Sequence, residues 1–178
     1  IEQLERPFVA TATQLTTGNA VFFNRGNTGM AVRASSSIPG VFYPVLIGGE
    51  EYVDGDLKKP VPVSVALEMG ADIVIAVYIS QQPKDNPIPR DIIDILTQSL
   101  RIMRQSIVTR ELESAQVVIR PIIGYTPEID AASKQHLIRV GEDAAIVAIP
   151  QIREWLRKVA NEKTPSRAGK QSLTKIAR

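Results

Sequence analysis

The sequence contains no cysteine and a single histidine, His136, and each shortage excludes a class of chemistry. Without cysteine the chain forms no disulfide, supplies no cysteine nucleophile and builds no thiolate metal site. One histidine is too few for a multi-histidine metal site within this chain, and it supplies a Ser-His-Asp triad poorly. His136 falls in an expected helix, where we interpret it as a surface or packing residue.

Long apolar runs are also missing. The densest one, Ile73–Ile79, can span a sheet but is too short to cross a bilayer. Residues Ile1–Arg6 have neither the basic nor the apolar region of a signal peptide. The chain has no Gly-x-Gly-x-x-Gly and no Walker motif, which disfavours a nucleotide-binding α/β domain.

What is present is typical of a globular protein: 178 residues, 44% hydrophobic and 22% charged, with a net charge of +2. The positive charge is concentrated in Asn161–Arg178. We expect residues 1–160 to form one domain portion and residues 161–178 to be a basic, weakly ordered tail. Because chain ends of this kind are usually solvated, the tail predicts no nucleic-acid partner.

The first half of the chain predicts short strands with tight turns and one short helix, Met30–Ser36. The expected strands are Phe8–Thr13, Ala20–Phe23, Val45–Ile47 and Glu51–Val53. Thr16–Asn19 and Gly48-Gly49 have the composition of hairpin turns. Asp54 therefore lies just past a strand end, in a turn that Gly55 makes sharp.

The second half predicts α/β architecture. A helix over Val63–Met69, with Gly70 at its C′ position, leads into a β-branched strand, Ile73–Val77, of the kind buried on both faces of a parallel sheet. The remaining expected elements are a loop at Gln81–Pro89, a helix at Asp91–Ser114, a strand at Val117–Ile119, a loop at Pro127–Asp130, and helices at Ala131–Val140 and Gly141–Val159. Pro150 is expected to kink or split the last helix.

The long helix Asp91–Ser114 is amphipathic, because its apolar residues recur at helical spacing. These are Ile92, Leu96, Leu100, Met103 and Ile107. The opposite face is expected to carry the polar side chains Arg101, Arg104, Gln105 and Glu111.

Four motifs occur in order between Ala31 and Ile79: Arg33–Phe42 (Arg-Ala-Ser-Ser-Ser-Ile-Pro-Gly-Val-Phe), Tyr52–Leu57 (Tyr-Val-Asp-Gly-Asp-Leu), Pro60–Val63 and Met69–Val77. This succession resembles patatin-like phospholipases and esterases, including bacterial members related to neuropathy target esterase. The resemblance implies a three-layer α/β/α fold with a mainly parallel central sheet, here an N-terminally truncated portion. It also implies a Ser–Asp dyad, with Asp54 as the catalytic acid/base and Gly55 and Asp56 as its supporting motif.

The nucleophile expected from this resemblance is not in the chain. No Gly-x-Ser-x-Gly sequence is present, and no glycine-rich stretch supplies an oxyanion hole. In the family both precede the region seen here, so we expect the serine on a missing N-terminal segment and this chain alone to be inactive. Ser35, Ser36 and Ser37 lack the flanking glycines and match a structural motif of the family.

Two positions depart from the family pattern. Asp56 stands where the family usually has glycine; we expect it to point to solvent, and to raise the pKa of Asp54 only if the two carboxylates approach each other. Lys59 stands where members often carry asparagine, so that polar support is lost or replaced. Phe42, Tyr43 and Trp155 are interpreted as packing residues rather than ligand contacts, with a place at the border of an acyl pocket as the alternative for Phe42.

The leading hypothesis is a serine-dependent lipid acyl hydrolase of the phospholipase A or esterase type. It needs no cofactor and no metal, since a dyad and backbone N–H groups suffice for acyl transfer. An acyltransferase variant and a non-catalytic patatin-like binding or regulatory module remain as alternatives. The expected partners are a lipid or ester substrate and a membrane surface contacted peripherally, and the expected location is cytoplasmic or peripheral to a membrane.

Overall fold

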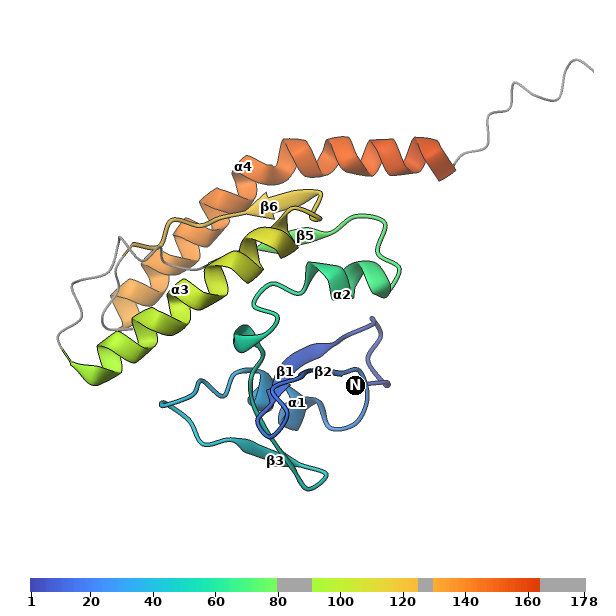
Figure 1. Ribbon diagram of the computed structural model, residues 1–178. Coiled ribbons are helices and arrows are strands. Elements are labelled where there is room, and N and C mark those ends of the chain that lie inside the picture. The colour runs from blue at the N-terminus through green and yellow to red at the C-terminus, as the bar shows by residue number, and fades with distance from the viewer. Residues whose placement is uncertain (80–90, 125–129, 164–178) are drawn as a thin grey trace, which may run out of the picture.

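The computed structural model describes residues 1–79, 91–124 and 130–163, which form two packed parts (Figure 1). Strands β1–β4 with helix α1 make the first part, and β5, β6, α3 and α4 make the second. The short elements η1 (Gly55–Leu57) and α2 (Val63–Glu68) lie between them. The expected loop Gln81–Pro89, most of the loop Pro127–Asp130 and the tail beyond residue 163 lie outside the described residues.

The first part is built on a four-stranded antiparallel sheet in the order β2-β1-β4-β3. Its strands are β1 (Ala10–Gln14), β2 (Ala20–Phe23), β3 (Val45–Ile47) and β4 (Glu50–Asp54). Both predicted hairpins are confirmed, and Gly48 and Gly49 adopt φ angles of 63° and 90° in the second turn. These angles are strained for residues with a Cβ atom, so the glycines permit the turn that leads into β4.

Helix α1 (Thr28–Ser35) covers one face of this sheet. The side chain of Asn27 caps it by accepting a hydrogen bond from the backbone N–H of Met30 at 2.9 Å. Ala34 is fully buried against Ala12 and Val45, and these small side chains let the helix approach the sheet closely. The helix predicted at Met30–Ser36 is confirmed, with an earlier start because of the asparagine cap.

The second part contains a parallel pair, β5 (Ile75–Val77) and β6 (Val117–Ile119). Helices α3 (Ile92–Leu112) and α4 (Ala131–Lys163) flank it (Figure 1). On the α3 side, Ala76 packs with Val108 and Leu112. On the α4 side, Val117 and Ile119 pack with Ala148. Helix, sheet and helix therefore form three layers locally, as α/β architecture requires.

The sheet differs from the expected mainly parallel one. The larger sheet is antiparallel because tight hairpins connect its neighbouring strands, and only the β5–β6 pair among the described residues is parallel. The expected burial of the Ile73–Val77 run on both faces is wrong for β5. Ile75 is 43% and Val77 54% exposed, because α4 contacts β6 and leaves this face of β5 uncovered.

The predicted division of Ala131–Val159 into two helices at Gly141 is wrong. Helix α4 is one helix from Ala131 to Lys163 and contains Pro150. Figure 1 shows the helix changing direction along its length, as expected for a proline that removes an intrahelical hydrogen bond. The helix extends to Lys163, three residues into the expected tail of residues 161–178. The division of the chain into a domain portion, residues 1–160, and a tail stays a prediction.

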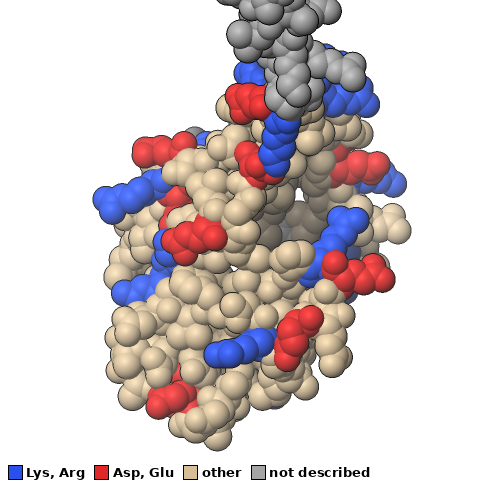
Figure 2. Space-filling view, turned by 90° about the vertical axis from the view of Figure 1, so that its right-hand side faces the viewer, with Lys and Arg blue, Asp and Glu red and all other residues tan. Residues whose placement is uncertain are grey.

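Charged side chains of both signs are interspersed on the face drawn in Figure 2. No helix in the described part of the chain is both long enough and apolar enough to span a membrane.

Candidate functional site

Asp54 is the last residue of β4 and the N-cap of the 3-10 helix η1 (Gly55–Leu57). Its Oδ1 atom accepts a hydrogen bond from the backbone N–H of Asp56 at 2.8 Å. One carboxylate oxygen is thus held by the turn, which fixes the direction of the side chain. The strand is one residue longer at this end than the predicted Glu51–Val53, and the turn that follows Asp54 agrees with the prediction from sequence.

The main chain of Asp54 is held from two sides. Its N–H donates to the carbonyl oxygen of Ser37 at 3.0 Å, and its carbonyl accepts from the Thr13 hydroxyl at 3.0 Å. Ser37 and Thr13 are themselves buried. The Ser-Ser-Ile-Pro-Gly segment and strand β1 therefore mount Asp54 rigidly, which is what a residue with a precise geometric task needs.

Gly55 is required by close approach of two backbones rather than by its φ angle. It is buried against β1, and a Cβ atom built on it would collide with the carbonyl oxygen of Thr11. Only glycine allows η1 to cross β1 at this distance. The glycine of the Asp-Gly motif thus places the turn, and with it the carboxylate of Asp54.

Asp54 lines a cavity of about 750 Å³ between the loop that follows α1, η1 and one face of α3. Most of the lining is apolar and includes Ile38, Leu57, Leu100, Met103 and Ile107. The polar groups are few and include Asp54, Asp56, Lys58, Arg101 and Arg104. A large apolar cavity with a few convergent polar groups is typical of a small-molecule site.

Burial raises the pKa of Asp54 to about 6, against the opposing electrostatic effect of Arg104. Asp56 does not contribute, so the possible cause considered from sequence, repulsion between the two carboxylates, is not what raises this pKa. Near neutral pH the group is mostly ionised but close to its titration point. A pKa near the working pH is favourable for a group that accepts and returns a proton.

Asp56 does not simply point to solvent. Its Oδ2 atom forms an ion pair with Nη1 of Arg104 on α3, and the two side chains are 37% and 22% exposed. Sequence reasoning placed Arg104 on a polar face opposite the apolar residues and missed this role. The only signal in the sequence was a carboxylate at a position where glycine is usual, because a partly buried charge needs a partner.

The two expected faces of α3 are not separated in the structure. Arg101 and Arg104 line the same cavity as Leu100, Met103 and Ile107. Glu111, expected on the solvent face, is only 9% exposed. The helix is surrounded by a cavity on one side and by α2 and β5 on another, so its buried positions do not follow a single stripe.

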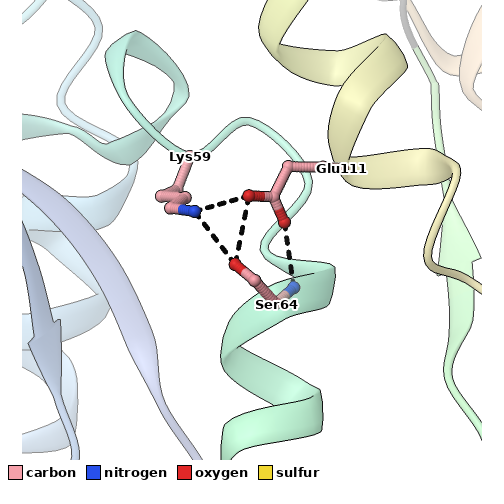
Figure 3. Close-up of polar contacts among 3 residues, drawn as sticks. All are labelled: Lys59, Ser64 and Glu111. Atoms are coloured by element: carbon pink, nitrogen blue, oxygen red, sulfur yellow. Dashed lines mark hydrogen bonds and ion pairs between the residues drawn. The ribbon is translucent and has the colours of Figure 1, made fainter.

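Glu111 is buried in a polar cluster with Lys59 and Ser64 (Figure 3). Its Oε1 accepts from Lys59 Nζ at 2.5 Å and from the Ser64 hydroxyl at 3.1 Å. Its Oε2 accepts from the Ser64 backbone N–H at 2.9 Å. Burial acts to raise the pKa of Glu111, but the hydrogen bonds from Lys59 and Ser64 outweigh it and hold the pKa below its ordinary value. Lys59 thus has polar partners on both α2 and α3.

The other candidate residues have structural surroundings. The Ser37 hydroxyl donates to the Arg33 carbonyl at 2.7 Å, as the interpretation of a structural motif predicts. His136 is exposed on α4 and Trp155 packs against β6, as expected. Phe42 and Tyr43 are 58% and 89% exposed, so their assignment as packing residues is wrong within the described chain.

No cluster of three metal-ligating His, Cys, Asp or Glu side chains occurs within residues 1–79, 91–124 and 130–163. The fold and the site define an α/β protein with a rigidly mounted, half-buried carboxylate in an apolar cavity. Residues 2–67 match the model of the patatin-like phospholipase family. The resemblance to patatin-like phospholipases that the sequence motifs indicate is therefore confirmed for this part of the chain.

Relatives support the same resemblance. The chain is 41% identical over 80 residues to uncharacterized NTE family proteins of Mycobacterium bovis and Mycobacterium tuberculosis. A second uncharacterized NTE family protein of Mycobacterium tuberculosis is 42% identical over 65 residues. These matches cover 45% and 36% of this chain but only 22% and 11% of the relatives. The chain thus spans a small fraction of the length of the relatives it matches.

Proposed function

We propose that the intact protein carrying this sequence is a serine-dependent lipid acyl hydrolase, a phospholipase A-type enzyme or esterase, and that Asp54 is its acid/base. The observation that carries the proposal is the placement of Asp54. It is the N-cap of a rigid turn, it is half-buried, and it lines an apolar cavity with a pKa of about 6. A lipid hydrolase needs a base of this kind beside room for an apolar substrate.

In the proposed reaction a serine Oγ attacks the ester carbonyl carbon while its proton passes to the Asp54 carboxylate. The alcohol leaves with that proton, and an acyl-serine ester remains. Water then attacks this ester while Asp54 accepts its proton. The acyl–Oγ bond breaks, Asp54 returns the proton to the serine oxygen, and the fatty acid leaves. We propose that the serine, in a Gly-x-Ser-x-Gly turn, is supplied by a segment preceding Ile1. With an alcohol in place of water the same steps give acyl transfer.

The three-layer, mainly parallel sheet of the family is part of the proposal. In the described chain the parallel pair β5–β6 leaves Ile75 and Val77 exposed, although parallel strands usually have both faces covered. We propose that further strands and helices of the intact protein cover this face and complete the sheet. The same addition would bring the serine turn to the cavity beside Asp54.

The proposed substrate also requires access to lipid. Val41, Phe42 and Tyr43 are exposed next to the cavity, which Val41 lines. We propose that this loop contacts lipid at a membrane surface. The proposed location of the enzyme is cytoplasmic or peripheral to a membrane. Phe42→Ser with Tyr43→Ser is expected to reduce sedimentation with phospholipid vesicles without changing hydrolysis of a soluble short-chain ester. Unchanged sedimentation would remove the loop from this role.

The central test uses Asp54→Asn in the intact protein, with p-nitrophenyl esters as substrates. We expect a loss of about 10²–10⁴-fold in kcat, the range for removing a general acid/base. Asp72→Asn is the matched control, because Asp72 is exposed and pairs with Lys163 at the surface. Full activity in a folded Asp54→Asn variant would remove Asp54 from the mechanism. If no serine of the intact protein reacts with a fluorophosphonate, a non-catalytic patatin-like module becomes the better interpretation.

A further inference from the structure

Asp56 ties the turn of Asp54 to helix α3. Its backbone N–H donates to Asp54 at 2.8 Å, while its carboxylate pairs with Arg104. A glycine at this position, which the family pattern usually has, would keep the first contact and lose the second. Aspartate in place of glycine at position 56 therefore has a partner, Arg104 of α3, about fifty residues further along the chain.

Arg104 lies beside both carboxylates of the Asp-Gly-Asp motif. It pairs directly with Asp56, and its positive charge lowers the pKa of Asp54 against the effect of burial. Asp54 in turn raises the pKa of Arg104, whose burial has the opposite and larger effect. All three side chains line the same cavity. Arg104 thus acts on both acids: it forms an ion pair with Asp56 and an electrostatic interaction with Asp54.

Helix α3 is anchored to the segment after Asp54 at a second point. Glu111 lies about two helical turns beyond Arg104, which places the two on the same side of the helix. It binds Lys59 and Ser64, as described above. Arg104 is therefore attached to a helix that is itself fixed relative to the turn, so its charge stays beside Asp54.

We propose that Arg104 is a positioning residue for Asp54: through its ion pair with Asp56 it fixes the Asp-Gly-Asp turn and keeps a positive charge beside the base. This inference rests on the proposed function of Asp54. Arg104 itself exchanges no proton with substrate, and it acts through the two aspartates. A salt bridge with a purely structural role would stabilise the fold but would leave the titration of Asp54 unchanged.

The charged groups around Asp54 define the expected signs. Arg104 and Arg101 face the cavity from α3, and Asp56 and Lys58 face it from η1 and the residue after it. Strand β1 brings no charge to Asp54: its neighbours there are Ala12 and the hydroxyl of Thr13, which donates to the main-chain carbonyl. Arg104→Met removes a positive charge and leaves Asp56 unpaired, and both changes raise the pKa of Asp54. Asp56→Asn leaves Arg104 with Asp54 as its remaining acidic neighbour in the motif, which lowers the pKa of Asp54.

The first experiment measures kcat/KM of the intact protein against pH with a neutral p-nitrophenyl ester. Arg104→Met is expected to move the acidic limb upward by about one pH unit, and Asp56→Asn to move it downward. Arg104→Lys should keep most of the wild-type profile because it retains the charge. Arg101→Met is the matched control, from the same helix and cavity. Because Arg104, and not Arg101, acts on the pKa of Asp54, the shift for Arg101→Met should be smaller than that for Arg104→Met.

The second experiment titrates the Asp54 carboxyl carbon by NMR in the same variants and does not depend on activity. Shifts of opposite sign for Arg104→Met and Asp56→Asn support the inference even if the protein hydrolyses no ester, an outcome that would overturn only the proposed function. An unchanged Asp54 titration in both variants overturns the inference, whatever the activity. If Arg104→Met does not fold, Asp56→Asn, which keeps the shape of the side chain, decides alone: a downward shift supports the inference, and no shift overturns it.

Discussion

Glu111 of α3 caps the N-terminus of α2. Its Oε2 atom accepts a hydrogen bond from the backbone N–H of Ser64 at 2.9 Å. The residue at the N-cap position of α2 (Val63–Glu68) is Pro62, which makes no side-chain capping hydrogen bond. A carboxylate from another helix therefore satisfies a donor that the local sequence leaves open. The same carboxylate holds Lys59, so one side chain connects α3 to both ends of the Lys59–Ser64 segment.

Breaking this cluster at one end should be costly. Lys59→Met leaves the largely buried Glu111 carboxylate without its cation, and we expect a loss of about 2–4 kcal/mol in the free energy of unfolding. Urea denaturation checks this. The double variant with Glu111→Gln should lose less than the sum of the two single losses, because the second change removes the unpaired charge. Additive losses would show that the two side chains are not coupled.

The surface pair Lys158–Glu154 is the control for that experiment. Its side chains are 51% and 64% exposed, so Lys158→Met should change stability by no more than about 1 kcal/mol. A similar loss at both sites would mean that burial does not set the strength of the Lys59 pair.

Gly55→Ala is expected to destabilise the protein by about 1–3 kcal/mol, because the methyl group collides with the backbone of β1. Thermal unfolding followed by circular dichroism measures the loss. Gly141→Ala is the matched control. Gly141 lies within α4 with open space around its Cα atom, so alanine there should stabilise the helix by about 0.5–1 kcal/mol. Equal effects at the two glycines would contradict the close approach of η1 and β1.

Ser37→Ala distinguishes a structural serine from a nucleophile. It removes the hydrogen bond from a buried hydroxyl to the Arg33 carbonyl, with an expected cost of about 1–2 kcal/mol in stability. Labelling of the intact protein by a fluorophosphonate should be unchanged. Ser36→Ala, at an exposed neighbour with a similar bond to Val32, should cost less. Loss of labelling in a folded Ser37→Ala variant would make Ser37 the nucleophile.

Asp54→Asn should stabilise the protein at neutral pH. The pKa of Asp54 is raised from 3.8 to about 6, so folding favours its protonated form. Its contribution to stability is greatest below about pH 4 and is lost as the pH rises through about 6. Because the group is only half-buried, we expect a gain of about 1–2 kcal/mol for the asparagine variant above pH 7 and little near pH 4. Urea denaturation at both pH values measures the difference, and an equal effect at both would exclude a raised pKa.

Much of the fold around Asp54 was predictable from the sequence because its signals are local. Gly48-Gly49 sets a hairpin, a β-branched run sets a strand, and the Asp-Gly pair sets the turn after it, each through the conformations of a few adjacent residues. The continuous helix α4 was not predictable, because tertiary packing against β6 outweighed the local effects of Gly141 and Pro150.

The sequence by itself determined where the candidate base is, since strand, turn and motif are all read along the chain. The reason for glycine beside it is tertiary, because a Cβ atom on Gly55 would collide with β1. Only the tertiary structure decided the surroundings of that base. Arg104 reaches Asp56, and Glu111 reaches Lys59, across about fifty residues of intervening chain. Ion pairs of this kind depend on how α3 packs beside η1 and α2, and a pairing between distant elements leaves no periodic signal in the sequence.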